Sequence, residues 1–301
     1  MQHPSFIGLI GKVRDYLLRP TFDSMQELAR RPDAATQILL QVEYRRLVQA
    51  GHALPRLQDI GFRVRSQTDE DGILLFLFAI IGTSDKTCIE ICAGDGQECN
   101  TANLILNHGW NGLLVDGNRD LAARGIEFYQ RAKETYVHPP RFLCSWITRG
   151  GINELFTSHG FTGEIDLLSL DIDGVDYWVW EAIDVVSPRV VVLEYQDIIG
   201  PERSVTVPYS DDFTAARHSM TGANPNFAGA SLAAFVKLGR RKGYRLVGVN
   251  RYGFNAFFVR NGLADDLLPE VPARECFSHP KVLAGMRDRF PLVRDHPWVE
   301  V

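Results

Sequence analysis

The clearest chemical pattern in this sequence is the run Glu90-Ile-Cys-Ala-Gly-Asp-Gly96, which follows a short apolar stretch and precedes a predicted helix. Glycines at such a turn let backbone amides come close to a ligand, and a helix N-terminus favours negative or electron-rich groups. Asp116 follows Gly96 by 20 residues, at the end of the next apolar stretch, where a carboxylate can accept the hydroxyls of a ribose. The pattern favours a nucleoside site. The alternative is a tight turn, with Asp116 capping the helix that follows it.

Three further carboxylates stand at predicted strand ends. Asp171 and Asp173 end one apolar stretch and Glu194 ends the next. The carboxyl ends of parallel strands share one edge of a sheet, which is where ligands bind. Carboxylates gathered there repel one another unless a cation, a proton or a positively charged ligand intervenes. The three are therefore candidate ligands for Mg²⁺ or Ca²⁺, which prefer oxygen atoms. The alternative is that Asp173 and Asp176 cap the next helix.

A reaction that removes a proton from its substrate needs a base. Asp173 and Glu194 are candidates by position, and His218 is a candidate because imidazole titrates near neutral pH. His218 lies in the irregular, polar segment 196–229, and a segment that long inside a compact domain is usually functional or disordered.

The elements that position these residues alternate between strand and helix. Such alternation predicts a doubly wound α/β fold with a mostly parallel, seven-stranded sheet. The last two strands are separated by five residues, so they form an antiparallel hairpin and one terminal strand is reversed. The predicted strands are 87–91, 112–116, 141–144, 165–171, 189–194, 244–249 and 255–259. The predicted helices are 70–81, 99–107, 121–133, 152–158, 178–185, 231–242 and 282–289.

Composition excludes several classes of protein. The chain has 301 residues, of which 45% are hydrophobic and 23% charged, as in ordinary globular proteins. The net charge of −5 argues against a nucleic-acid partner, and no apolar run approaches the ~20 residues that span a bilayer. Five cysteines imply no disulfide framework, and the N-terminus does not resemble a signal peptide, so we expect a cytoplasmic protein.

These motifs together resemble the class I S-adenosylmethionine-dependent methyltransferases. Their first motif is acid-x-Gly-x-Gly-x-Gly, which Glu90 to Gly96 matches except at Cys92, and Asp116 matches their second acid. The substitution at Cys92 is compatible with binding if that residue has ordinary backbone angles. Within the family, 66–72, 171–174 and 229–232 are most similar to the FkbM-type branch, which implies an O-methyltransferase of small molecules.

The resemblance also implies a set of cofactor-binding residues and a division of the chain. The expected S-adenosylmethionine ligands are Glu90, Gly94, Asp95, Gly96, Asn100, Asp116, Gly117, Asn118, Ser145, Trp146 and Asp171. The expected parts are an N-terminal helical cap or lid (1–64), a Rossmann-like domain (65–261) with an acceptor-binding insertion (196–229), and a C-terminal extension (262–301). The helical cap and the extension are candidate homodimer surfaces.

Two alternatives remain open at this point. Gly94-x-Gly96 with Asp116 would also suit an NAD-dependent oxidoreductase, but Cys99 stands where a dinucleotide fingerprint has its third glycine. A non-catalytic binding protein on the same scaffold is the other alternative, and Cys92 is the feature that favours it.

Overall fold

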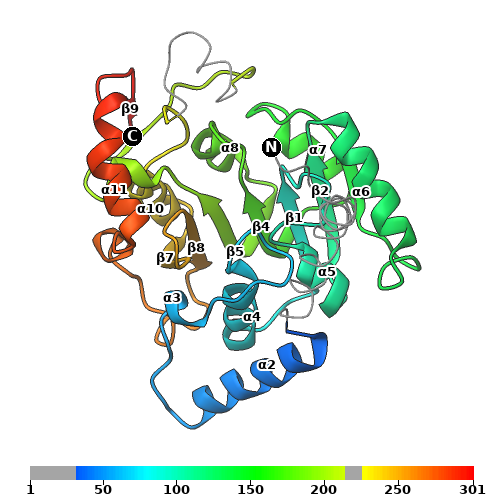
Figure 1. The fold of residues 1–301 in the computed structure, drawn as a ribbon. Coiled ribbons are helices and arrows are strands. Elements are labelled where there is room, and N and C mark those ends of the chain that lie inside the picture. Colours follow the sequence, from blue (N-terminus) through cyan, green and yellow to red (C-terminus); the bar gives the residue numbers. More distant parts are fainter. Residues whose placement is uncertain (1–31, 214–225) are drawn as a thin grey trace, which may run out of the picture.

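A computed structural model describes residues 32–213 and 226–301 of the chain. Within these residues the central element is a seven-stranded sheet with the order β3-β2-β1-β4-β5-β8-β7 (Figure 1). Its strands are β1 (Thr87–Ile91), β2 (Asn111–Asp116), β3 (Arg141–Cys144), β4 (Gly163–Leu170), β5 (Val186–Glu194), β7 (Tyr244–Val249) and β8 (Asn255–Arg260).

The strand directions confirm the predicted fold class. The five strands from β3 to β5 are mutually parallel, and β8 pairs antiparallel with both β5 and β7. The order reverses between β1 and β4: the chain runs outward from β1 to β2 and β3, then crosses back from β3 to β4 on the other side of β1. In open α/β sheets such a switch point is where ligands bind, outside the carboxyl ends of the strands.

Helices cover both faces of the sheet. They are α2 (Ala34–Gln49), α3 (Leu57–Ile60), α4 (Glu70–Ile81), α5 (Ala102–His108), α6 (Arg119–Arg131), α7 (Ile152–Ser158), α8 (Asp176–Ala182), α10 (Leu232–Arg241) and α11 (Pro280–Asp288). Helices α4, α7 and α11 lie within two residues of their predicted starts, whereas α5 begins three residues late, after the glycine turn is complete.

Alternation along the strands divides the core into two layers. On β5, Val191 packs into the layer that contains α7, α8 and α10, whereas Val190 packs into the layer of α4, α5 and α6. Both side chains are fully buried, as expected for a parallel sheet covered on both faces. Helix α2 lies on the outer side of α4 (Figure 1), where Tyr44 packs edge-on against Phe76.

The insertion and the C-terminal extension pack on each other. Strand β6 (Val205–Thr206) of the insertion pairs antiparallel with β9 (Val299–Glu300) of the extension. Three single-turn 3₁₀ helices, η1 (Asp197–Ile199), η2 (Ala273–Cys276) and η3 (Phe290–Leu292), belong to the same region. The segment of the insertion that the structure describes is therefore held in place by the end of the chain.

Candidate functional site

The predicted site begins at the turn between β1 and α5. The Asp116 carboxylate accepts a hydrogen bond from the Gly94 amide with Oδ2 (2.8 Å) and one from the Asn118 amide with Oδ1 (2.7 Å). Asp116 does not cap the next helix, because the side chain of Asn118 caps α6 by accepting from the amides of Asp120 and Leu121. The capping alternative for Asp116 is wrong.

The two glycines of the turn are needed for different reasons. Both have left-handed backbone angles, with φ of +61° at Gly94 and +70° at Gly96. A Cβ on Gly96 would lie 2.7 Å from the Phe142 ring and 2.8 Å from the Tyr129 ring, so the space there is filled by the protein itself. A Cβ on Gly94 would meet nothing within 4 Å. Gly94 is therefore the glycine whose backbone faces open space that a ligand can occupy.

Cys92 does not have ordinary backbone angles. Its φ of +61° lies in the left-handed region that disfavours residues with a Cβ, so the expectation of ordinary backbone angles at this position is wrong. Its side chain reaches the surface of the site. Desolvation by the surrounding protein, followed by the charges of Asp176, Asp116 and other nearby carboxylates, raises the pKa of the Cys92 thiol well above its usual range. The thiol is therefore a neutral group.

Three other predicted cofactor-binding residues, Glu90, Asn100 and Asp95, form hydrogen bonds to groups of the protein itself. Glu90 is buried, and its Oε2 accepts from the Thr101 amide (2.7 Å); burial raises the pKa of this carboxyl to about 7. Asn100 donates to the Ser169 hydroxyl (3.0 Å), and Asp95 accepts from the Gln97 amide (3.2 Å). Glu90 and Asn100 therefore tie the turn to β1 and β4, while Asp95 bonds within the turn.

The predicted adenine side lies at the end of β3. Trp146 packs over the backbone of Gly117, since a Cβ there would lie 3.1 Å from the indole. The side chain is 54% exposed, and its Nε1 donates to the Asp211 carbonyl (2.6 Å). A cavity of about 270 Å³, lined in part by Ser145 and Trp146, lies between this strand end and α7. Trp146 thus links the predicted nucleoside side to the insertion.

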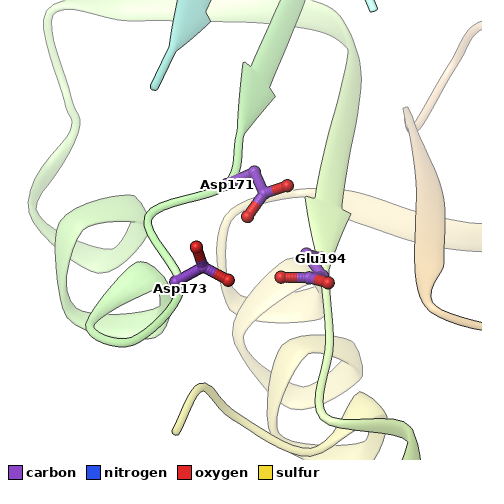
Figure 2. Close-up of side chains that lie close together, drawn as sticks. All are labelled: Asp171, Asp173 and Glu194. Carbon is purple, nitrogen blue, oxygen red and sulfur yellow. The ribbon is translucent and has the colours of Figure 1, made fainter. Parts of the chain in front are cut away.

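The three predicted carboxylates at the ends of β4 and β5 come together. Asp171, Asp173 and Glu194 each offer an oxygen atom, and these atoms lie within 4.8 Å of one another. Figure 2 shows the carboxylates of Asp173 and Glu194 directed at the space between them, with Asp171 next to it. Asp173 itself has a left-handed φ of +56°.

The electrostatics of this cluster favour protonation of at least one of its carboxyl groups. Burial, and next the charge of Asp173, raises the pKa of Asp171 to about 6. Burial, and next the charge of Asp171, raises the pKa of Glu194 well above its usual range. Carboxylates this close cannot all be ionised without a compensating positive charge.

The capping alternative for Asp173 and Asp176 is also wrong. Helix α8 begins at Asp176 after the N-cap residue Val175, and no side chain accepts a hydrogen bond from the amides of its first turn. The buried Asp176 carboxylate instead accepts from the amides of Ile172 (2.6 Å) and Gly174 (3.0 Å). It therefore shapes the turn that carries Asp173, a role that the sequence analysis missed.

Residues 205–213 of the insertion lie over the same edge. The Trp178 indole donates to the Val207 carbonyl (2.8 Å), and the Tyr209 hydroxyl accepts from the Arg149 amide (2.7 Å). The Phe213 ring lies against Gly174, where a Cβ would come within 2.2 Å of it. The insertion thus contacts both the β3 side and the turn after β4, whereas the candidate base His218 lies outside the described residues.

A further cavity lies away from this edge. It has a volume of about 450 Å³ between α3, β7 and residues 267–276, and no predicted site residue lines it. In 32–213 and 226–301, no helix combines the length and apolarity required to cross a lipid bilayer.

Comparison by sequence finds no matching protein-family model and no significantly similar curated protein. Solved structures with a similar arrangement include an O-methyltransferase from Bacillus cereus in complex with S-adenosylhomocysteine. It is 12% identical with a TM-score of 0.42, over 78% of this chain and 94% of that one. Magnesium protoporphyrin IX methyltransferase from Synechocystis PCC 6803, with bound S-adenosylmethionine, is 12% identical with a TM-score of 0.38, over 83% of this chain and 96% of that one.

The similar structures are not all methyltransferases by name. The cyclase SpnF is 10% identical with a TM-score of 0.38, over 72% of this chain and 75% of that one.

Proposed function

We propose that this protein is an S-adenosylmethionine-dependent methyltransferase that acts on a small molecule, most specifically an O-methyltransferase. The observation that carries the proposal is the placement of two groups on one sheet edge. The Asp116–Gly94 pair stands at the ends of β1 and β2, and the Asp171, Asp173 and Glu194 carboxylates stand at the ends of β4 and β5. A nucleoside and an acceptor bound to these groups would meet at the switch point of the sheet.

The first group suits a ribose. Each oxygen of the Asp116 carboxylate accepts one backbone hydrogen bond, and a carboxylate has about four acceptor positions, so two remain for the ribose hydroxyls. Open space beside Gly94 supports the approach of the cofactor, and the exposed indole of Trp146 offers a surface for an adenine ring. When bound, S-adenosylmethionine supplies an electrophilic methyl group.

The second group suits an acceptor with a hydroxyl. Glu194 or Asp173 would accept the proton of that hydroxyl as its oxygen bonds to the methyl carbon, and the bond from carbon to sulfur breaks. The main contribution of the protein is to hold the acceptor in line with the methyl group, because orientation supplies a large part of such rate enhancements. If Mg²⁺ or Ca²⁺ binds instead, the same carboxylates would hold it through their oxygen atoms.

A binding experiment tests the cofactor. We expect S-adenosylhomocysteine to raise the melting temperature in a thermal shift assay, because a ligand that binds only the native state stabilises it, by about 2.7 kcal/mol at 100 times its Kd. NAD should have no effect. A shift with NAD alone would favour an oxidoreductase, and no shift with either compound would contradict the proposed nucleoside site.

A second candidate is a non-catalytic binding protein on the same scaffold. The left-handed Cys92, where the family motif has glycine, is the observation that favours it. Transfer of a labelled methyl group to any hydroxylated compound of a small-molecule library would exclude this candidate. Tight binding of S-adenosylhomocysteine without transfer across hydroxyl, amine and carbon acceptors would support it.

A further inference from the structure

The inner face of helix α2 holds it on the rest of the protein. Leu40, Tyr44 and Leu47 pack into the core layer that contains α4. Gln37 is fully buried on the same face, and its side-chain oxygen accepts a hydrogen bond from the side-chain amide of Asn103 (2.8 Å). These residues recur every three or four positions, so they lie on one side of the helix.

The opposite face of α2 is also apolar, but it is exposed. Ile38 is 52% exposed, Leu39 is 68% exposed and Val42 is 38% exposed. With 3.6 residues per turn, these side chains and exposed Ala35 lie within an arc of about 100°, on the side away from α4 (Figure 1). We call Ala35, Ile38, Leu39 and Val42 the outer stripe.

The outer stripe is uncovered in the part of the chain that the structure describes, residues 32–213 and 226–301. Single exposed apolar residues are ordinary on a protein surface. A helix that is apolar on two opposite faces is instead typical of one that is buried on both faces, and grouped exposed apolar residues mark interaction surfaces. The stripe therefore indicates that α2 has a further binding partner.

The arrangement of the stripe suits contact with a second copy of itself. In a two-fold symmetric dimer the same patch of both copies meets, so the patch must be complementary to itself. If two α2 helices cross antiparallel with the axis between residues 38 and 39, Ile38 of each copy lies beside Leu39 of the other. Ala35 of each copy then lies beside Val42 of the other. Every residue of the stripe thus has an apolar partner.

The charges at the two ends of α2 favour the antiparallel arrangement. The exposed Asp33 carboxylate stands at the N-cap, and the exposed Arg45 and Arg46 lie near the other end of the helix. In the antiparallel pair, Asp33 of each copy comes within about one turn of Arg45 of the other, so opposite charges meet at both ends of the contact. A parallel pair would instead bring the arginines of the two copies together.

We propose that this protein forms a homodimer through the outer stripe of α2. The proposal goes beyond the methyltransferase function and does not depend on it. A contact made by about two turns of helix from each copy is smaller than a standard protein interface of about 1,600 Å². We therefore expect a reversible dimer with a Kd on the order of 10–100 µM.

Analytical ultracentrifugation of the full chain tests the dimer. The mass should rise from one copy to two between about 1 µM and about 1 mM protein. Leu39→Glu places two carboxylates beside the axis and should weaken the dimer at least about 10-fold. Arg45→Glu should weaken it about 3- to 10-fold, because an attraction at each end becomes a repulsion. The matched control is Leu292→Glu on η3, where the leucine is 61% exposed, which should dimerise like the wild type.

Cysteine cross-linking tests the register of the two helices. Leu39→Cys lies next to the proposed axis, where the two thiols of a dimer come within reach of a disulfide, with Cβ atoms about 3.5–4.5 Å apart. Mild oxidation should therefore produce a covalent dimer. The wild type, with exposed Cys92 and Cys144, measures the background. Glu43→Cys, on the same helix but outside the stripe, should stay at that background.

Three results would overturn the proposal. They are a wild-type protein that remains monomeric at about 1 mM, a dimer that Leu39→Glu leaves intact, and cross-linking of Leu39→Cys no greater than background. For a monomer, the melting temperature of Leu39→Glu identifies the alternative. A loss that is independent of protein concentration would mean that another segment of this chain covers the stripe, and an unchanged melting temperature would mean that a different molecule does.

Discussion

Asp116 and Gly94 are joined by a hydrogen bond of 2.8 Å from the glycine amide to the carboxylate, which fastens the end of β2 to the turn after β1. The bond fixes the turn at the position where a ribose would lie. The same carboxylate also holds the Asn118 amide, at the start of α6. Asp116 thus holds the turn and the start of α6 together, and the proposed ribose would use its remaining acceptor positions.

This double use determines the effect of removing the carboxylate. We expect Asp116→Ala to abolish binding of S-adenosylhomocysteine, since each hydrogen bond to a charged group contributes roughly 1.5–3 kcal/mol. The fold should remain intact, with a loss of stability of about 1–3 kcal/mol from the two amides left without their acceptor. Calorimetry and chemical denaturation measure the two effects. An unchanged affinity would contradict the ribose assignment, and Asp120→Asn, on the exposed first turn of α6, is the control.

The two glycines of the turn should respond differently to substitution. Gly96→Ala should be strongly destabilising for two reasons. The new Cβ would overlap the Phe142 and Tyr129 rings, and the left-handed backbone angle at this position disfavours any residue with a Cβ. Gly94→Ala should lower the free energy of unfolding only by the cost of the left-handed backbone conformation, about 1–2 kcal/mol, because its Cβ would meet no other group of the protein. Its main effect should be a lower affinity for the cofactor, because the Cβ would stand in the space proposed for that ligand. Melting temperature and calorimetric affinity together separate the two outcomes. Equal losses of stability would contradict the distinction.

Cys92→Gly should stabilise the protein by about 1 kcal/mol. Glycine adopts the left-handed φ of +61° without the penalty that a Cβ incurs, and the substitution also completes the family motif. Chemical denaturation measures the change. The control is Cys144→Gly, at an exposed position on β3 without a left-handed angle, which should destabilise. Destabilisation by Cys92→Gly would contradict this prediction. It would mean that contacts of the Cys92 side chain stabilise the fold by more than its left-handed backbone conformation destabilises it.

The carboxylate cluster allows a direct test of metal dependence. If a divalent cation binds there, a chelator should reduce methyl transfer and Mg²⁺ should restore it, while affinity for S-adenosylhomocysteine stays nearly constant. If Glu194 acts as the base without a metal, the chelator should have no effect and Glu194→Gln should lower the rate about 10²- to 10⁴-fold. If the Glu194→Gln variant keeps full activity and the chelator does not change that activity, Glu194 is neither a metal ligand nor the base.

Glu90 should make stability depend on pH. Burial raises the pKa of this carboxyl from 4.5 to about 7 in the folded state, so between these values the folded protein keeps a proton that the unfolded chain releases. Stability from this group is therefore present at low pH and lost as the pH rises from about 4.5 to 7. Glu90→Gln should become more stable relative to wild type across this window, by an amount on the order of 1–3 kcal/mol. Urea denaturation at pH 4.5, 6 and 8 measures the difference, and a constant difference would contradict it.

The fold class, with its reversed terminal strand, and the placement of the carboxylates at strand ends could be predicted from the sequence. Continuous apolar strands that alternate with amphipathic helices allow few arrangements other than a parallel sheet, and the short connection between β7 and β8 requires a hairpin. Asp116, Asp171 and Glu194 each stand at or directly after the end of a strand. Because the carboxyl ends of all parallel strands lie at the same edge of the sheet, residues at these ends lie on one edge even when they are far apart in the sequence.

The tertiary structure alone decided how individual residues are used. Gly96 is required by rings that come from α6 and β3, and Asp176 turns back to the loop before it instead of capping its helix. Cys92 has a left-handed backbone angle although it is not a glycine. Local patterns record which face of an element is buried, but these roles depend on which side chains from other elements fill the space, and no spacing in the sequence encodes that.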